Sequence, residues 1–147
     1  MNSVVEQYFK LNPESQRNVQ LFLCEVALEV WEKLIPENFI YRESVAGTSQ
    51  IFDVTLPRKA LDSVDSIELM HQVCGCYREP IVALQDGDVE FSEKAEYAYY
   101  AIYNFFLSSL HRTSSDPWLI PSHVLSAVGI EEAERTLELA INSLNLK

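Results

Sequence analysis

The sequence predicts an all-α fold, a single-domain compact bundle around a central hydrophobic helix at residues 92–112. Apolar residues recur at three- and four-residue spacing along several long segments, which is the period of a buried helix face. The chain contains only 4 Gly and 6 Pro, too few for the many tight turns of an all-β fold. With 147 residues, we expect one helical domain over residues 1–147 with one core.

The N-terminal part predicts two helices. A short amphipathic helix is expected at residues 3–11, with Val4, Val5, Tyr8 and Phe9 facing inward. A long helix follows to residue 35, capped by Asn12, with Pro13 in its first position. Its inward face is expected to comprise Val19, Phe22, Leu23, Val26, Ala27, Val30, Trp31 and Leu34.

Residues 36–56 allow two interpretations. Residues 39–41 and 51–54 could be the strands of a hairpin that turns near Gly47. Alternatively, a short helix at residues 37–46 ends at Gly47 and a second short segment follows. An isolated two-stranded hairpin is only marginally stable, and no further strand-like run is present to join it. Helix and loop are therefore favoured.

Four short helices and the central helix are expected next. Thr55 caps a helix at residues 55–64, and Asp65 with Glu68 forms a loose capping box for a helix that reaches Cys74. Another helix is expected at residues 77–85, a turn at 86–88, and a helix at 121–128 that ends at Gly129. A final amphipathic helix is expected at residues 131–146. Its inward face comprises Ala133, Leu137, Ala140, Ile141 and Leu144.

The central helix is apolar on most of its circumference, which is typical of the buried centre of a bundle. We expect Ser92 to cap its first turn, and His111 and Arg112 to lie at the negative end of the helix dipole. We expect the helices at 12–35 and 131–146 to flank it. Its two apolar stripes are Ala95, Ala98, Tyr99, Ile102, Phe105, Phe106 and Leu110, and Tyr97, Tyr100, Ala101, Tyr103 and Leu107.

The net charge of -11 argues against nucleic acid or an anionic membrane as a partner and favours a basic protein. The simpler interpretation is that the acidity only confers solubility. No apolar run is long enough to span a membrane, and no secretory leader is recognisable, so a cytoplasmic protein is expected. Its three cysteines are then expected to be free thiols.

The sequence contains one candidate metal site, His71-x-x-Cys74-x-Cys76. A closed zinc site needs four ligands, and Cys24 would have to supply the fourth. Two buried thiols and a histidine at a helix end are the simpler interpretation. No nucleophile elbow, phosphate loop or dinucleotide motif is present. We therefore expect no metal, no cofactor and no enzymatic activity.

The densest acidic run leads into the central helix and predicts a surface for partner binding. Carboxylates pair with Lys and Arg, and tyrosine rings beside them add contact area and stack on guanidinium groups. The simpler interpretation is a solvated helix start beside core tyrosines, and it is favoured for Tyr99. The predicted partner-binding residues are Asp86, Asp88, Glu90, Glu93, Glu96, Tyr97 and Tyr100. A second acidic stripe comprises Glu25, Glu29 and Glu32.

Two segments, residues 34–47 and 56–64, resemble a pattern in small all-helical bacterial proteins and in helical immunity proteins of polymorphic-toxin systems. The residues that carry the resemblance are Leu34, Pro36, Phe39, Glu43, Gly47, Arg58, Ala60, Leu61 and Asp62. The resemblance implies an all-α fold and an inhibitory binding role, and it implies no catalytic residues.

These observations together predict a non-enzymatic acidic binding protein of a bacterial cytoplasm, an immunity-type inhibitor that neutralises a basic toxin such as a nuclease. The first alternative is a homo-oligomeric structural or regulatory module, a homodimer through the aromatic residues of the central helix. The second is a metal-binding protein through His71, Cys74 and Cys76.

Overall fold

The computed structural model describes residues 1–45, 47–74, 91–112 and 116–146, and its fold is all-α, as the sequence predicts. The described residues form seven α-helices, one β-hairpin and a terminal 3-10 turn. The helices are α1 (Asn2–Phe9), α2 (Pro13–Leu34), α3 (Leu56–Asp62), α4 (Ile67–Cys74), α6 (Glu93–His111), α7 (Leu119–Val128) and α8 (Ile130–Asn142). The remaining elements are β1 (Ile40–Val45), β2 (Thr48–Asp53) and η1 (Ser143–Leu146).

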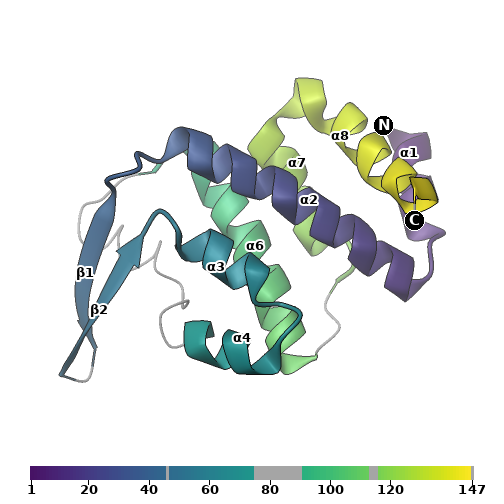
Figure 1. Cartoon of the computed structure of the whole chain (residues 1–147). Coiled ribbons are helices and arrows are strands. Elements are labelled where there is room, and N and C mark those ends of the chain that lie inside the picture. The colour runs from purple at the N-terminus through teal and green to yellow at the C-terminus, as the bar shows by residue number, and fades with distance from the viewer. Residues whose placement is uncertain (46, 75–90, 113–115, 147) are drawn as a thin grey trace.

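Helix α6 occupies the centre of the bundle, as predicted (Figure 1). It packs against α2, α7, α3 and α4, whereas α8 makes its main contacts with α7, α2 and α1. The expectation that the last helix flanks the central one is therefore wrong. Helix α7 packs on α6, and α8 covers α7 and α2.

The caps of the two long helices are confirmed. The side chain of Asn12 accepts a hydrogen bond from the Ser15 amide at 2.8 Å, and Ser92 Oγ accepts one from the Ala95 amide at 3.2 Å. Each bond satisfies one of the backbone donors that a helix start leaves unpaired. Because both caps are local, the sequence alone was sufficient to place them.

Small residues let other helices approach α6 closely. Ala95, Ala98 and Ala101 have no exposed surface, and the larger Phe105 and Phe106 are equally buried one to two turns further on. A helix with alanine on its face presents little side-chain bulk, so a neighbouring backbone can lie near it. On α2 the buried residues are Val19, Leu23, Cys24, Ala27, Leu28 and Trp31.

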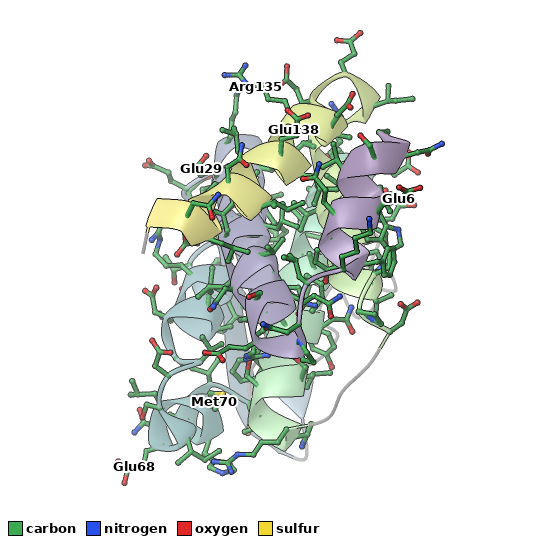
Figure 2. The ribbon with its side chains drawn as sticks, turned by 90° about the vertical axis from the view of Figure 1, so that its right-hand side faces the viewer. Glu6, Glu29, Glu68, Met70, Arg135 and Glu138 are labelled. Atoms are coloured by element: carbon green, nitrogen blue, oxygen red, sulfur yellow. The ribbon has the colours of Figure 1, made fainter. Side chains whose placement is uncertain are left out.

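Two apolar residues that periodicity predicts to face inward do not. Phe9 is 48% exposed and Leu34 is 43% exposed. Both lie in the last position of their helix, where few neighbouring elements remain to cover a side chain. The acids and the arginine labelled in Figure 2 are exposed, whereas Met70 of α4 is buried.

Residues 40–45 and 48–53 form a hairpin, which was the second interpretation of this segment, so the favoured prediction of helix and loop is wrong there. Strands β1 and β2 pair antiparallel from Ile40 opposite Asp53 to Val45 opposite Thr48, and Gly47 takes a positive φ of 80° in the turn, which suits glycine. The hairpin is not isolated, because Phe52 is only 4% exposed and joins the helical core. Burial against helices supplies the stability that a two-stranded sheet lacks by itself.

Trp31 connects α2, α6 and the chain that leaves the hairpin. Its ring centroid lies 5.4 Å from that of Tyr99 and 5.8 Å from that of Phe91. Its Nε1 donates a hydrogen bond of 2.9 Å to the carbonyl of Val54. One buried side chain therefore fixes the position of the hairpin on the bundle.

Several smaller boundaries differ from the predictions. Ser66 rather than Asp65 caps α4, since its Oγ accepts a bond of 3.3 Å from the Leu69 amide. Helix α7 begins at Leu119, two residues before the predicted start, and ends at Val128 before Gly129 as expected. Helix α8 begins at Ile130, one residue before the predicted start, and passes into η1 at Ser143. The helix predicted at residues 77–85 and the turn at 86–88 lie outside the described residues.

Replacing Trp31 by Phe should lower the free energy of unfolding by about 1–3 kcal/mol, because the Val54 carbonyl loses its donor. Urea denaturation measures the change. Trp118→Phe is the matched control, since Trp118 is half-buried and packs beside Phe9 at a centroid distance of 5.6 Å. An equal loss in both variants would contradict the role assigned to Trp31.

Candidate functional site

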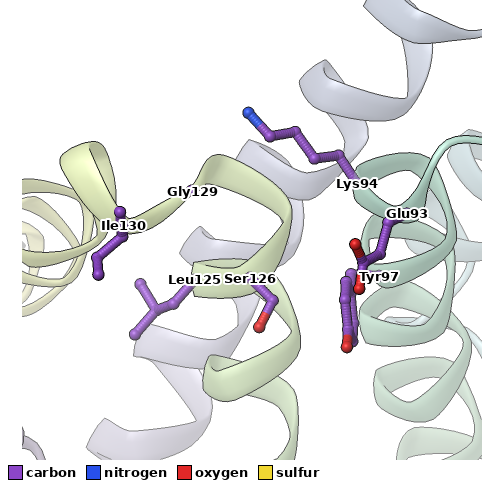
Figure 3. A pocket seen from close by; sticks show the side chains of 7 residues that line it. All are labelled: Glu93, Lys94, Tyr97, Leu125, Ser126, Gly129 and Ile130. Atoms are coloured by element: carbon purple, nitrogen blue, oxygen red, sulfur yellow. The ribbon is translucent and has the colours of Figure 1, made fainter.

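A surface hollow of about 440 Å³ lies between the start of α6 and the corner where α7 meets α8 (Figure 3). Two of the predicted partner-binding residues, Glu93 and Tyr97, line it from α6. Opposite them are residues of α7 and of its junction with α8. The hollow is lined by Glu93, Lys94, Tyr97, Leu125, Ser126, Gly129 and Ile130.

The corner depends on Gly129, which has φ 93° and ψ 160° and ends α7 while preceding α8. Residues with a side chain are strongly strained in this region of conformational space. The Lys94 ammonium reaches across to it: a Cβ on Gly129 would lie 3.4 Å from Lys94 Nζ. Lys94 also borders a second hollow of about 310 Å³, together with Leu34 and Glu132.

Ile130 is 94% exposed, although it is a large apolar residue in the first position of α8. Leu125, one helix turn before Gly129, is 8% exposed and belongs to the core. The wall opposite α6 therefore has two large apolar residues, Leu125 in the core and Ile130 in solvent, and Ser126 lines it as well. Neither residue was predicted for the site, because Leu125 lies within the predicted helix at 121–128 and Ile130 lies between Gly129 and the predicted helix at 131–146, far in the sequence from Glu93 and Tyr97.

Tyr97 and Tyr100 are half-buried, so each is partly core and partly surface. Both rings lie beside His123 of α7, with centroid distances of 5.9 Å for Tyr97 and 6.3 Å for Tyr100. Tyr99, in contrast, is 2% exposed, which confirms the core interpretation for that residue. Glu93 is exposed, and Glu96 is half-buried.

The structure describes two of the five acids in the predicted run, Glu93 and Glu96. Asp86, Asp88 and Glu90 lie outside the described residues, so only the members on α6 are placed. Of these, Glu93 and Tyr97 share the hollow, whereas Glu96 and Tyr100 do not line it.

A second acidic surface combines the predicted stripe of α2 with residues of α3 and the turn after it. Glu25 and Glu29 face Asp62 and Asp65 across a hollow of about 410 Å³. Arg58 also lines it and donates from Nε to Glu32 Oε2 at 2.8 Å, which raises the pKa of Arg58 further. Asp62 and Asp65 were missed as members of this surface because they are more than thirty positions from Glu29 in the sequence.

Among the described side chains, no third ligand lies beside His71 and Cys74 of the predicted metal site. No group of three or more His, Cys, Asp or Glu is arranged there to hold a metal ion. His71 is exposed, and Cys74 Sγ lies 3.3 Å from the His71 carbonyl. Cys76 lies outside the described residues, so that part of the hypothesis stays a prediction.

Cys24 is a buried residue of the core. It is fully buried, with Sγ 3.8 Å from the carbonyl of Ala101 on α6. Burial raises the pKa of its thiol well above the usual range. Metal ligation requires the thiolate, so the environment of Cys24 opposes the role of fourth ligand.

No helix in the described part of the chain is long and apolar enough to cross a membrane. Comparisons with protein-family models, with curated proteins and with solved structures found no match. The resemblance of residues 34–47 and 56–64 to helical immunity proteins therefore stays a prediction.

We expect His123 to make the contact between α6 and α7 sensitive to pH. Its Nδ1 is buried and has no hydrogen-bond partner among the described residues, and burial lowers the pKa of the ring below the ordinary 6.5. The unfolded chain then binds the proton more readily than the folded one. Stability should therefore fall as the pH drops below 6.5, and the loss should stop growing below the lowered pKa.

Urea denaturation of the wild type and His123→Phe at pH 7.5 and 5.5 checks this expectation. Phenylalanine keeps a planar ring between Tyr97 and Tyr100 and cannot titrate. The wild type should lose more stability than the variant between the two pH values. Parallel losses would show that His123 is not the group responsible.

Proposed function

We propose that this protein is a non-enzymatic acidic binding protein, an immunity-type inhibitor that covers the basic surface of a toxin. The observation that carries the proposal is the hollow in which the exposed carboxylate of Glu93 and the half-buried ring of Tyr97 stand together. A carboxylate beside an aromatic ring suits Lys and Arg side chains, which pair with the one and stack on the other.

The overall charge supports the same class of partner. With 22 acidic residues against 11 Lys and Arg, the chain attracts basic proteins over distances comparable with the Debye length. Electrostatic attraction of this kind mainly raises the association rate. A fast association rate is useful to an inhibitor that must reach its target before the target acts.

The absence of a catalytic motif in the sequence agrees with a binding role. Inhibition by coverage requires only a complementary surface, and the resemblance to helical immunity proteins points in the same direction. The toxin is expected to present Lys and Arg around its active site, as nucleases do when they contact phosphate groups.

The first test uses the protein encoded by the gene adjacent to this one. Isothermal titration calorimetry of the two purified proteins should show a one-to-one complex, and the complex should lack the toxic activity of the free partner. No binding to a basic neighbour, or binding without loss of its activity, would contradict the proposal.

Replacing Asp86, Asp88, Glu90 and Glu93 by their amides should weaken that complex by about tenfold, since exposed ion pairs contribute up to about 1 kcal/mol each and often less. The slope of affinity against salt concentration should flatten as well. The matched control replaces Glu25, Glu29, Asp62 and Asp65, which removes the same charge from the hollow between α2 and α3.

The comparison of the two variants distinguishes an effect of the acidic residues at the start of α6 from an effect of the total charge. Equal weakening would mean that only the total charge matters. A larger effect of the control would assign binding to the α2–α3 surface instead. Either result would contradict the placement of the site on α6.

A further inference from the structure

Opposite Glu93 and Tyr97, the hollow is lined by two large apolar residues, Leu125 and Ile130. They can make an apolar contact with a partner, which the acidic residues cannot. Exposed apolar residues are common, and a single one carries no information. Ile130 is 94% exposed and lines the same hollow as the half-buried Tyr97 and the core residue Leu125. Figure 3 shows Ile130 and Leu125 on one side of Ser126 and the Tyr97 ring on the other.

We propose that this hollow receives one aliphatic side chain of the partner, and that Lys or Arg residues flank that side chain in the partner sequence. The inference rests on the proposed function and names the chemistry of the segment that the site binds. A volume of about 440 Å³ is ample for a leucine or isoleucine side chain together with adjoining main chain.

The affinity of the proposed complex favours an apolar contact of this kind. Exposed ion pairs are screened by salt and contribute little affinity. Burial of an aliphatic side chain contributes more affinity than an exposed ion pair does, and binding energy is usually concentrated in a few buried anchors surrounded by weaker polar contacts. Ile130, Leu125 and Tyr97 form the anchor contact, and Glu93 belongs to the polar rim.

The charges around the hollow favour a basic occupant over a second copy of this chain. Glu131 and Glu132 follow Ile130 and are exposed, as is Glu93 across the hollow. Among the residues that line the hollow, Lys94 is the cation. Docking of two copies through this face would bring both sets of acids together, and each copy carries a net charge of -11. Lys and Arg on either side of the bound side chain would instead pair with these acids.

Two synthetic peptides test the proposal directly. Acetyl-Lys-Lys-Leu-Lys-Lys-amide and the same peptide with Ser in place of Leu carry equal charge, so they differ only in the aliphatic group. In NMR titrations the Leu peptide should bind the wild type about fivefold or more tightly, because about 1 kcal/mol corresponds to that ratio. Its shift changes should centre on Tyr97, Leu125 and Ile130.

Ile130→Ser should abolish the preference for the Leu peptide. The side chain is almost fully exposed, so the variant should fold as the wild type does. Leu139→Ser is the matched control: Leu139 is 50% exposed on the same helix and, nine residues on, faces roughly the opposite direction. This control should keep the preference. Lys94→Gln should tighten binding of both peptides by removing a like charge.

Three results would overturn the inference. The first is equal affinity of the wild type for the two peptides. The second is an Ile130→Ser variant that still prefers the Leu peptide. The third is a wild-type dimer, detected by light scattering, that the Ile130→Ser substitution dissociates. The last result would assign the hollow to a second copy.

Titration of the adjacent gene's product separates this inference from the proposed function. If the four-acid variant weakens that complex and Ile130→Ser leaves it unchanged, the function stands and the anchor is wrong. If the wild type does not bind the product at all, the proposed function fails independently of the peptide result.

Discussion

The burial of α6 is the constraint on which the rest of the structure depends. Ala95, Ala98, Ile102, Phe105 and Phe106 are shielded from solvent, so other elements must cover this helix along most of its length. Helices α2, α3, α4 and α7 do so, and hydrophobic burial of this kind is the dominant favourable term in folding. The hairpin is held to the same core through Phe52 and through the hydrogen bond between Trp31 and the Val54 carbonyl.

Features with local causes could be predicted from the sequence. The Asn12 and Ser92 caps depend on neighbouring amides, and the long helices follow from apolar periodicity. The hairpin was one of two interpretations of its segment, and the sequence could not decide in its favour because its stability comes from residues far away in the chain. The predicted inward positions of Phe9 and Leu34 are wrong for a related reason. Each residue is the last of its helix, where the apolar periodicity continues but no neighbouring element covers the side chain.

Only the part of the candidate site that lies on one helix could be predicted from the sequence. Glu93 and Tyr97 lie one helix turn apart, so sequence spacing placed them on a common surface. Leu125 and Ile130 join them only because α7 packs on α6, which is a tertiary contact. The α2–α3 surface likewise unites acids that the sequence separates. Only packing can decide which charged and apolar groups face each other across a hollow.

Helix α6 thus contributes to the core along most of its length and to the proposed binding surface at its start. Amide hydrogen exchange of the protein, alone and in complex with the product of the adjacent gene, tests this division of roles most directly. We expect added protection in the complex at residues 92–100 and 125–132 and none at residues 25–32 and 58–65. Protection at the second pair of segments, with no change at the first, would contradict it.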